Sequence, residues 1–206
     1  QRQMCIRDRI DETVEALDTL VRHGHVRYVG VSNWAAWQIV KALGISERKG
    51  LARFESLQAY YTIAGRDLER ELVPMLRSEG VGLMVWSPLA GGLLTGKYKP
   101  GASPEANTRF TLGTAGNMYQ DRYWNERSFN TVTQLHALAD EAGVPLATLA
   151  VAWVMANPLI TAPLLGASRP EQLDATLAAA EYKLDPALKQ KLDELTAEYR
   201  KGDAPR

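Results

Sequence analysis

The feature that most constrains the fold of this chain is a repeated alternation between short apolar runs and longer segments of helical period. Runs rich in apolar and β-branched residues occupy positions 26–33, 54–62, 81–88 and 159–168. Apolar residues recur at helical spacing in 10–23, 34–43, 67–80, 127–143, 145–157, 169–180 and 185–202. Parallel strands need a crossover between them, so this alternation predicts an α/β fold with four strand-helix units in one parallel sheet.

Two parallel architectures compete at this point, an open doubly wound sheet and a closed barrel. The open sheet predicts a G-x-G-x-x-G fingerprint after a strand, and neither VGVSNW nor LLGASRP matches it. A barrel predicts polar groups at the carboxyl end of every strand. Each run ends that way, in Ser32-Asn33, Gln58, Trp86-Ser87 and 166–168. We therefore predict a parallel (β/α)8 barrel of the TIM type, with four of its eight strands in these 206 residues.

Composition narrows the class of partner. The formal net charge is zero, so no field of one sign is available to attract nucleic acid or an anionic membrane. The single cysteine, Cys5, excludes an intramolecular disulfide framework and a cysteine metal cluster. No apolar run approaches the roughly 20 residues of a membrane span, and no signal-peptide pattern is visible. We expect a cytoplasmic protein with a small-molecule partner; the sequence leaves the oligomeric state open.

The first nine residues, QRQMCIRDR, lack the patterning that begins at Ile10. They resemble the translated read-through of a transposon-end sequencing adapter, and a disordered leader is the alternative. We expect residues 1–9 to be a non-native leader and 10–206 to be the protein itself, with its upstream part missing.

Four segments, taken in order, resemble aldo-keto reductases. They are GHVRYVGVSNW, SLQAYY, WSPLAGGLLTGKY and GASRPEQL, and each lies at a predicted strand end. The resemblance runs from Ile10 onward and implies the carboxyl-terminal half of that barrel, its last four units. It also implies an enzyme that binds NADPH without a Rossmann domain and reduces aldehydes or ketones to alcohols by hydride transfer.

The resemblance implies a set of nicotinamide contacts. The ring of Trp86 would stack on the nicotinamide, and Ser32, Asn33 and Gln58 would hydrogen-bond its carboxamide. Residue type alone leaves other interpretations open: Trp86 as packing, Asn33 as a helix N-cap and Gln58 as an ordinary polar strand end.

The resemblance also implies phosphate contacts. The loop along the pyrophosphate would be formed by Ser87, Pro88, Leu89, Ala90 and Gly91. Cations would come from Lys97 and Arg109. The 2′-phosphate would lie against a helix start formed by Gly166, Ser168, Arg169 and Gln172. Relatives often carry Glu-Asn where this chain has Ala175-Thr176, which weakens the expectation for the adenine.

The family's catalytic Tyr, Lys, Asp and His lie on the first four strands, which this chain lacks, so we assign no catalytic residue and expect the chain alone to be inactive. His23, His25 and His136 are isolated, and no spacing suggests a metal site. Tyr60 and Tyr61 have no adjacent lysine and would be poor general acids. We also expect a functional loop or lid in the Gly/Pro-rich stretch 91–121.

Two rival functions stay open. One is a non-catalytic NADP-binding regulatory subunit, such as the potassium-channel β-subunits that share this fold. The other is a phosphate- or flavin-binding TIM barrel of another family.

Overall fold

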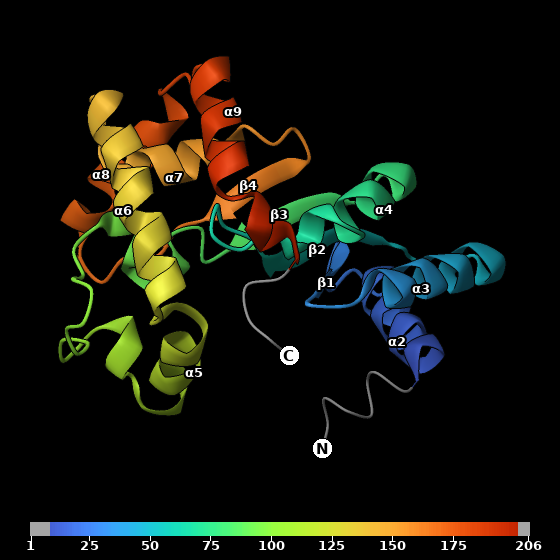
Figure 1. The fold of residues 1–206 in the computed structure, drawn as a ribbon. Coiled ribbons are helices and arrows are strands. Elements are labelled where there is room, and N and C mark those ends of the chain that lie inside the picture. Colours follow the sequence, from blue (N-terminus) through green and yellow to red (C-terminus); the bar gives the residue numbers. More distant parts are fainter. Residues whose placement is uncertain (1–8, 202–206) are drawn as a thin grey trace. The chain divides into compact units, whose positions relative to one another are not determined.

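The structure, a computed structural model, describes residues 9–201. Of the predicted leader 1–9, residues 1–8 lie outside the described residues. Helices and strands alternate as predicted (Figure 1). Their bounds are α2 Ile10–Arg22, β1 Val29–Ser32, α3 Ala36–Lys49, β2 Phe54–Tyr60, η1 Asp67–Glu69, α4 Leu72–Glu79, β3 Gly82–Trp86, η2 Ala90–Thr95, η3 Arg109–Thr111, α5 Gly113–Tyr123, α6 Glu126–Glu141, α7 Leu146–Met155, β4 Ile160–Leu164, η4 Pro170–Gln172, α8 Asp174–Leu177, η5 Ala178–Ala180, α9 Pro186–Leu195 and η6 Ala197–Lys201.

The sheet has four strands in the order β1-β2-β3-β4, which is also their order in the chain. β1 and β2 run parallel, with Val29 opposite Phe54 and Ser32 opposite Gln58. Neighbours that follow one another with a helix between them are the arrangement that strand-helix alternation produces. The predicted α/β class and parallel sheet are confirmed.

The chain divides into two compact units, each described by itself below. Among the described residues, the first unit comprises 9–59 together with Glu69–Met84. The second unit comprises Tyr60–Leu68 and 85–201.

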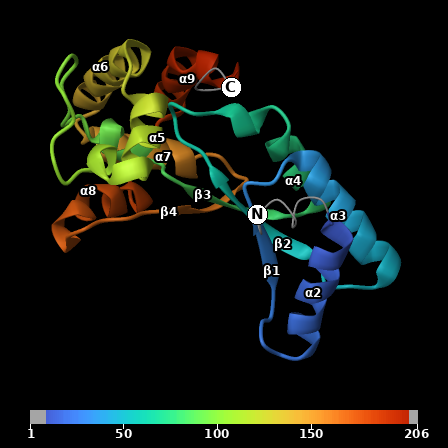
Figure 2. The ribbon, with the colours of Figure 1, turned by 90° about the horizontal axis from the view of Figure 1, so that it is seen from below.

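In the first unit, helices cover one side of the β1-β2 pair. α2 packs against α3, and Figure 2 shows both helices beside the two strands. Along β1, Val29 and Val31 are buried whereas Gly30 and Ser32 are exposed. This alternation follows from the two-residue period of a strand, which sends successive side chains to opposite faces.

Helix ends in the first unit follow the stop signals in the sequence. Gly80 adopts φ +63° directly after α4, a conformation that glycine enters without steric cost. Pro74, which the sequence suggested as an irregularity, lies in the first turn of α4, because the helix begins at Leu72. A proline is tolerated there, since the first amides of a helix have no partner within it.

The second unit is built around α7. Every residue of this helix from Leu146 to Val154 is buried, and α6, α8 and β4 pack against it. Asp185 caps α9 by accepting from the amides of Ala187 and Leu188, as the Asp-Pro pair predicts. No single helix among residues 9–201 is long and apolar enough to cross a membrane; α6 and α7 pass that test only together, bent by 93°.

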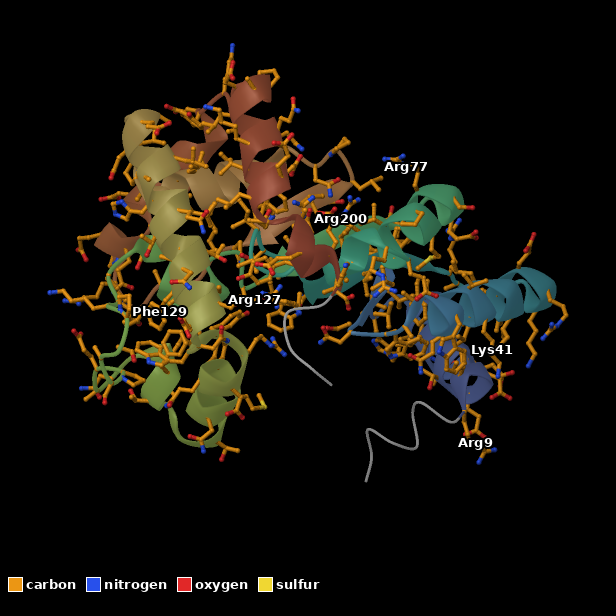
Figure 3. All side chains as sticks on the ribbon, viewed as in Figure 1. Arg9, Lys41, Arg77, Arg127, Phe129 and Arg200 are labelled. Atoms are coloured by element: carbon orange, nitrogen blue, oxygen red, sulfur yellow. The ribbon has the colours of Figure 1, made fainter. Side chains whose placement is uncertain are left out.

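The stretch predicted as a loop or lid is folded. It contains η2, η3 and most of α5, joined by an aromatic cluster in which Phe110 contacts Tyr98 at 5.2 Å and Trp124 at 4.8 Å between ring centroids. Phe129 of α6, labelled in Figure 3, extends the cluster by meeting Trp124 at 5.2 Å. The glycines of α5 hid this helix from sequence reasoning, because glycine lowers helix propensity.

Candidate functional site

Three of the predicted nicotinamide contacts lie together in the first unit. Ser32 and Gln58 are partners across β1 and β2. The backbone N–H of Asn33 donates to the Gln58 carbonyl oxygen at 3.1 Å, and its Nδ2 donates to the Ser32 Oγ at 3.1 Å. These three polar residues therefore share the carboxyl end of β1.

Asn33 is not the N-cap of the next helix, so that alternative is wrong. α3 begins at Ala36, and the amide of the capping residue Ala35 donates to the Oε1 of Gln38 at 2.9 Å. Asn33 itself has φ +56°, in the left-handed region that asparagine enters more readily than most residues. Its backbone turns the chain away from β1.

In the second unit, Trp86 ends β3 and is supported from one side by Tyr60. The two rings are 5.2 Å apart and tilted by 46°. The Tyr60 phenol packs on Gly65, where a Cβ would collide with its hydroxyl. The buried Thr62 hydroxyl donates to the Pro88 carbonyl oxygen at 2.9 Å and so joins this turn to the segment after β3. The indole is thus held by a neighbouring turn and not only by its own strand.

The segment after Trp86 is a tight turn whose amides donate internally. Ser87 and Ala90 both have positive φ, +60° and +50°. The amide of Ala90 donates to the Ser87 carbonyl at 2.9 Å, and that of Gly92 donates to the Leu89 carbonyl at 2.9 Å. The amide of Gly91 donates to the Ser87 Oγ at 3.2 Å. A phosphate beside this turn would therefore depend on cations more than on these three amides.

Arg122, in the last turn of α5, lies over the same aromatic group. Its guanidinium carbon is 4.9 Å from the ring centroid of Tyr60 and 5.8 Å from that of Trp86. A guanidinium at such distances is attracted by the ring quadrupole. Trp86 therefore has an aromatic ring and a permanent cation as neighbours.

The hydroxyl of Tyr123 is buried beside this group. The side chain is 1% exposed, and its Oη makes no hydrogen bond of normal geometry to residues 9–201. Burial raises the pKa of Tyr123, and the nearby Tyr60, Ser87 and Arg122 side chains lower it by less. The phenol therefore stays protonated at neutral pH as a buried donor next to the turn at Ser87.

The predicted cations are placed as follows. Lys97 is exposed, with its Nζ 4.9 Å from the Tyr98 ring centroid. Arg109 begins η3 and is also exposed. Its guanidinium lies 3.9 Å from the point where Gly166 would carry a Cβ. The structure thus brings Arg109 to the loop after β4, although 57 positions separate it from Gly166 in the sequence.

Around Ser168 the structure corrects the sequence prediction. The Ser168 amide and hydroxyl both donate to the Gln172 Oε1, at 3.0 and 3.1 Å, so these two predicted residues do meet. The expected helix 169–180 is instead three short pieces, η4, α8 and η5, of which α8 has four residues. So short a helix has little dipole to offer a phosphate. The exposed Arg169 side chain is the remaining source of positive charge there.

Sequence reasoning missed Arg122 and Tyr123, because they lie between the stretch 91–121 taken for a loop and the helix predicted from position 127. A signal was present in the spacing of Tyr119 and Tyr123, which are four residues apart and face one way on a helix. Their rings are 5.9 Å apart in α5.

The histidines take no part in this group. His136 lies with its Nδ1 3.0 Å from the Asp140 Oδ2, and His23 meets the His25 ring edge-on at 6.0 Å. Across the described part of the chain, no three His, Cys, Asp or Glu side chains gather in a way that could hold a metal ion.

Comparison with known proteins adds three relatives and a family. The model of the aldo/keto reductase family matches residues 4–197. A "probable voltage-gated potassium channel subunit beta" from Arabidopsis thaliana is 36% identical over 189 residues, 90% of this chain and 57% of that protein. The "uncharacterized oxidoreductase YrpG" from Bacillus subtilis is 38% identical over 185 residues, 90% of this chain and 53% of that protein.

A third relative has a named reaction. The versiconal hemiacetal acetate reductase of Aspergillus parasiticus is 30% identical over 184 residues, 89% of this chain and 52% of that protein. The chain thus spans about half the length of the curated relatives it matches.

Proposed function

Because the chain belongs to the aldo/keto reductase family, we propose that it supplies the NADPH-binding half of an oxidoreductase that reduces an aldehyde or ketone to an alcohol. The resemblance seen in the sequence and the family match agree on this family. The cofactor, the carbonyl substrate and the closed (β/α)8 barrel are parts of the proposal.

The observation that carries the proposal is the setting of Trp86. An indole at a strand end, held beside Tyr60 and Arg122 and followed by the turn at Ser87, is suited to stack a flat heterocycle. The Tyr123 hydroxyl is buried beside it, near the side chains of Tyr60, Ser87 and Arg122. This setting fits a nicotinamide ring.

The family resemblance assigns a second requirement, the orientation of the ring, to polar residues of the first unit. Ser32, Asn33 and Gln58 offer amide and hydroxyl groups at the end of β1. A carboxamide needs both a donor and an acceptor, and an Asn or Gln side chain supplies each. When bound, NADPH supplies the hydride and the ring that carries it; these residues would fix which way the ring faces.

Phosphate binding would fall to side-chain cations. Arg109, beside Gly166, and the exposed Lys97 and Arg169 are suited to pair with phosphate oxygens. Ser168, already bonded to Gln172, would add a hydroxyl. We propose that Ser168 and Arg169 favour the 2′-phosphate of NADPH over the hydroxyl of NADH.

No residue of this chain is proposed to protonate the carbonyl oxygen. Tyr123 is poorly suited to that step, because its raised pKa weakens it as an acid. The proton donor would belong to a part of the protein outside these residues, and the chain alone would bind cofactor without turnover.

A titration of intrinsic tryptophan fluorescence tests the proposal. It uses the full-length protein, with NADPH, NADH and FMN added separately. We expect NADPH to quench, NADH to bind more weakly, and Trp86→Leu to weaken NADPH binding by about threefold to tenfold. Trp37→Leu is the matched control, because Trp37 lies exposed on the outer helix α3. Preferential binding of FMN, or equal effects of the two substitutions, would contradict the proposal.

The second candidate is a non-catalytic nucleotide-binding subunit. It is favoured by relatives named as potassium channel β-subunits in Arabidopsis thaliana and Schizosaccharomyces pombe, 36% and 35% identical. Tight NADPH binding with no NADPH oxidation across a panel of aldehydes and ketones would select this candidate over the reductase.

A further inference from the structure

Arg122 places a permanent positive charge beside the indole proposed to carry the nicotinamide. Its guanidinium carbon lies 5.8 Å from the Trp86 ring centroid and 4.9 Å from that of Tyr60. Arginine keeps its charge at every physiological pH. It lies in the last turn of α5, where the partial negative charge at the carboxyl end of the helix stabilises a cation.

Contacts along α5 fix where this charge lies. The Gln120 Nε2 donates to the Phe110 carbonyl oxygen at 2.6 Å and ties α5 to η3. Tyr119 packs on Gly91, where a Cβ would be 2.7 Å from its Cδ1. Gly91 belongs to the turn that follows Trp86, so the helix bearing Arg122 is seated on the segment that leaves the indole. The cation and the indole are held by one set of contacts.

The two forms of a nicotinamide differ in charge at this place. The oxidised ring is a cation and the reduced ring is neutral. A fixed cation nearby repels the oxidised ring and leaves the reduced ring almost unaffected. Coulomb repulsion over less than about 10 Å in a partly buried site is large enough to change an affinity several-fold.

We propose that Arg122 makes the site selective for the redox state of its cofactor, holding the reduced nicotinamide in preference to the oxidised one. This inference rests on the proposed function, because it requires a nicotinamide at Trp86. Its consequence is kinetic: the enzyme would retain NADPH and release NADP+ readily, so NADP+ would inhibit it little. In a sensing subunit the same charge would make the protein report the reduced form.

The test measures the dissociation constants of NADPH and NADP+ for the full-length protein by calorimetry. We expect Arg122→Gln to tighten NADP+ binding relative to NADPH by about threefold to tenfold. Arg122→Lys keeps the charge and should keep most of the wild-type ratio. Arg127→Gln is the matched control, since Arg127 lies 4.1 Å over the Tyr199 ring and belongs to α6.

Each outcome has a distinct meaning. The inference would be overturned if Arg122→Gln left the ratio of the NADP+ and NADPH dissociation constants unchanged, or if Arg122→Lys changed that ratio as much as Arg122→Gln does. Either result would leave the proposed function standing. Failure of both nucleotides to bind the wild type would overturn the proposed function and this inference with it. Near-ultraviolet circular dichroism of Arg122→Gln shows whether the indole keeps its setting; a changed spectrum together with equal weakening of both nucleotides would identify Arg122 as structural and contradict the proposal.

Discussion

Two arginines in the second unit each lie over an indole, and they differ in what else surrounds them. Arg66 is 4% exposed, lies 5.0 Å from the Trp153 ring centroid and contacts the carboxylate of Asp193 at 3.4 Å. Arg122 lies 5.8 Å from the Trp86 ring centroid among the phenols of Tyr60 and Tyr123.

The interactions of Arg66 and its neighbours stabilise the fold. The Arg66 Nη1 also donates to the Thr196 Oγ1 at 2.9 Å, and Asp193 accepts from the Trp153 Nε1 at 2.9 Å. These bonds join the turn after β2 to α7 and α9. A cation over an indole thus stabilises the fold in one place and, by our proposal, selects a ligand in the other; the surrounding groups decide which.

The largest expected effect is the loss of the structural arginine. Arg66→Ala leaves Asp193 without this partner and removes the packing on Trp153. We expect the free energy of unfolding to fall by about 3 kcal/mol, measured by urea denaturation. Arg122→Ala is the comparison, with an expected loss of less than about 1 kcal/mol. Equal losses would break the distinction between the two arginines.

Two glycine substitutions test how α5 packs on the turn after Trp86. Gly91→Ala must place a Cβ 2.7 Å from Tyr119 at φ +70°, whereas Gly101→Ala meets nothing within 4 Å at φ +75°. Both should lose about 1 kcal/mol to backbone strain, and Gly91→Ala about 1 kcal/mol more from the clash. Only Gly91→Ala should also alter the fluorescence of Trp86. Identical melting curves for the two variants would show that the Tyr119 side chain moves aside without cost, which would contradict this prediction.

The pH dependence of the stability that Asp193 contributes tests the structural role of the Arg66 group. Burial acts to raise the pKa of Asp193, but hydrogen bonds from Lys189 and Trp153, with the charges of Lys189 and Arg66, outweigh it and hold that pKa below its usual value. The ionised carboxylate therefore stabilises the fold fully above about pH 4 and progressively less as the pH falls through its folded-state pKa.

Asp193→Asn should accordingly lower the free energy of unfolding by about 1 to 2 kcal/mol at pH 7. Below the folded-state pKa of Asp193 it should lower it by almost nothing. Unfolding curves at several pH values measure this, with Asp11→Asn on the exposed side of α2 as the control. A constant difference at every pH would contradict the assignment.

The smallest expected value is the coupling energy between Arg122 and its ring, and the Arg66 pair provides the comparison. Double-mutant cycles of Arg66 with Trp153 and of Arg122 with Trp86 should give coupling energies of about 2 and about 0.5 kcal/mol. The buried pair should couple more strongly because less water screens it. A reversed order would mean that Arg122 contributes to stability as much as Arg66 does.

Much of the fold was predictable, because its signals are local. The Asp185-Pro186 start of α9, the Gly80 stop of α4 and the strand at β3 all agree with the structure. α5 was not predictable in this way. Its Gly116 lies where a Cβ would be 2.9 Å from the Phe110 carbonyl oxygen, so the residue that weakens the helix locally is required by its packing.

The candidate site residues differ in the same way. The sequence could predict Ser32, Gln58 and Trp86 as polar strand ends, because the strands of a parallel barrel end at one edge, and their roles toward a cofactor stay predictions. Arg122 could not, since its place over Trp86 depends on how a separate helix seats on a turn. The break in the helix predicted at 169–180 likewise has no local signal as strong as the proline-glycine stops elsewhere.

The bond between Gln120 and Phe110 has a wider consequence. It makes η3 and α5 one piece, with Arg109 near Gly166 at its start and Arg122 over Trp86 at its end. A dinucleotide bound as proposed would touch this piece at its phosphates and again at its nicotinamide. Loss of this hydrogen bond should therefore weaken phosphate binding and disturb the orientation of the nicotinamide at the same time.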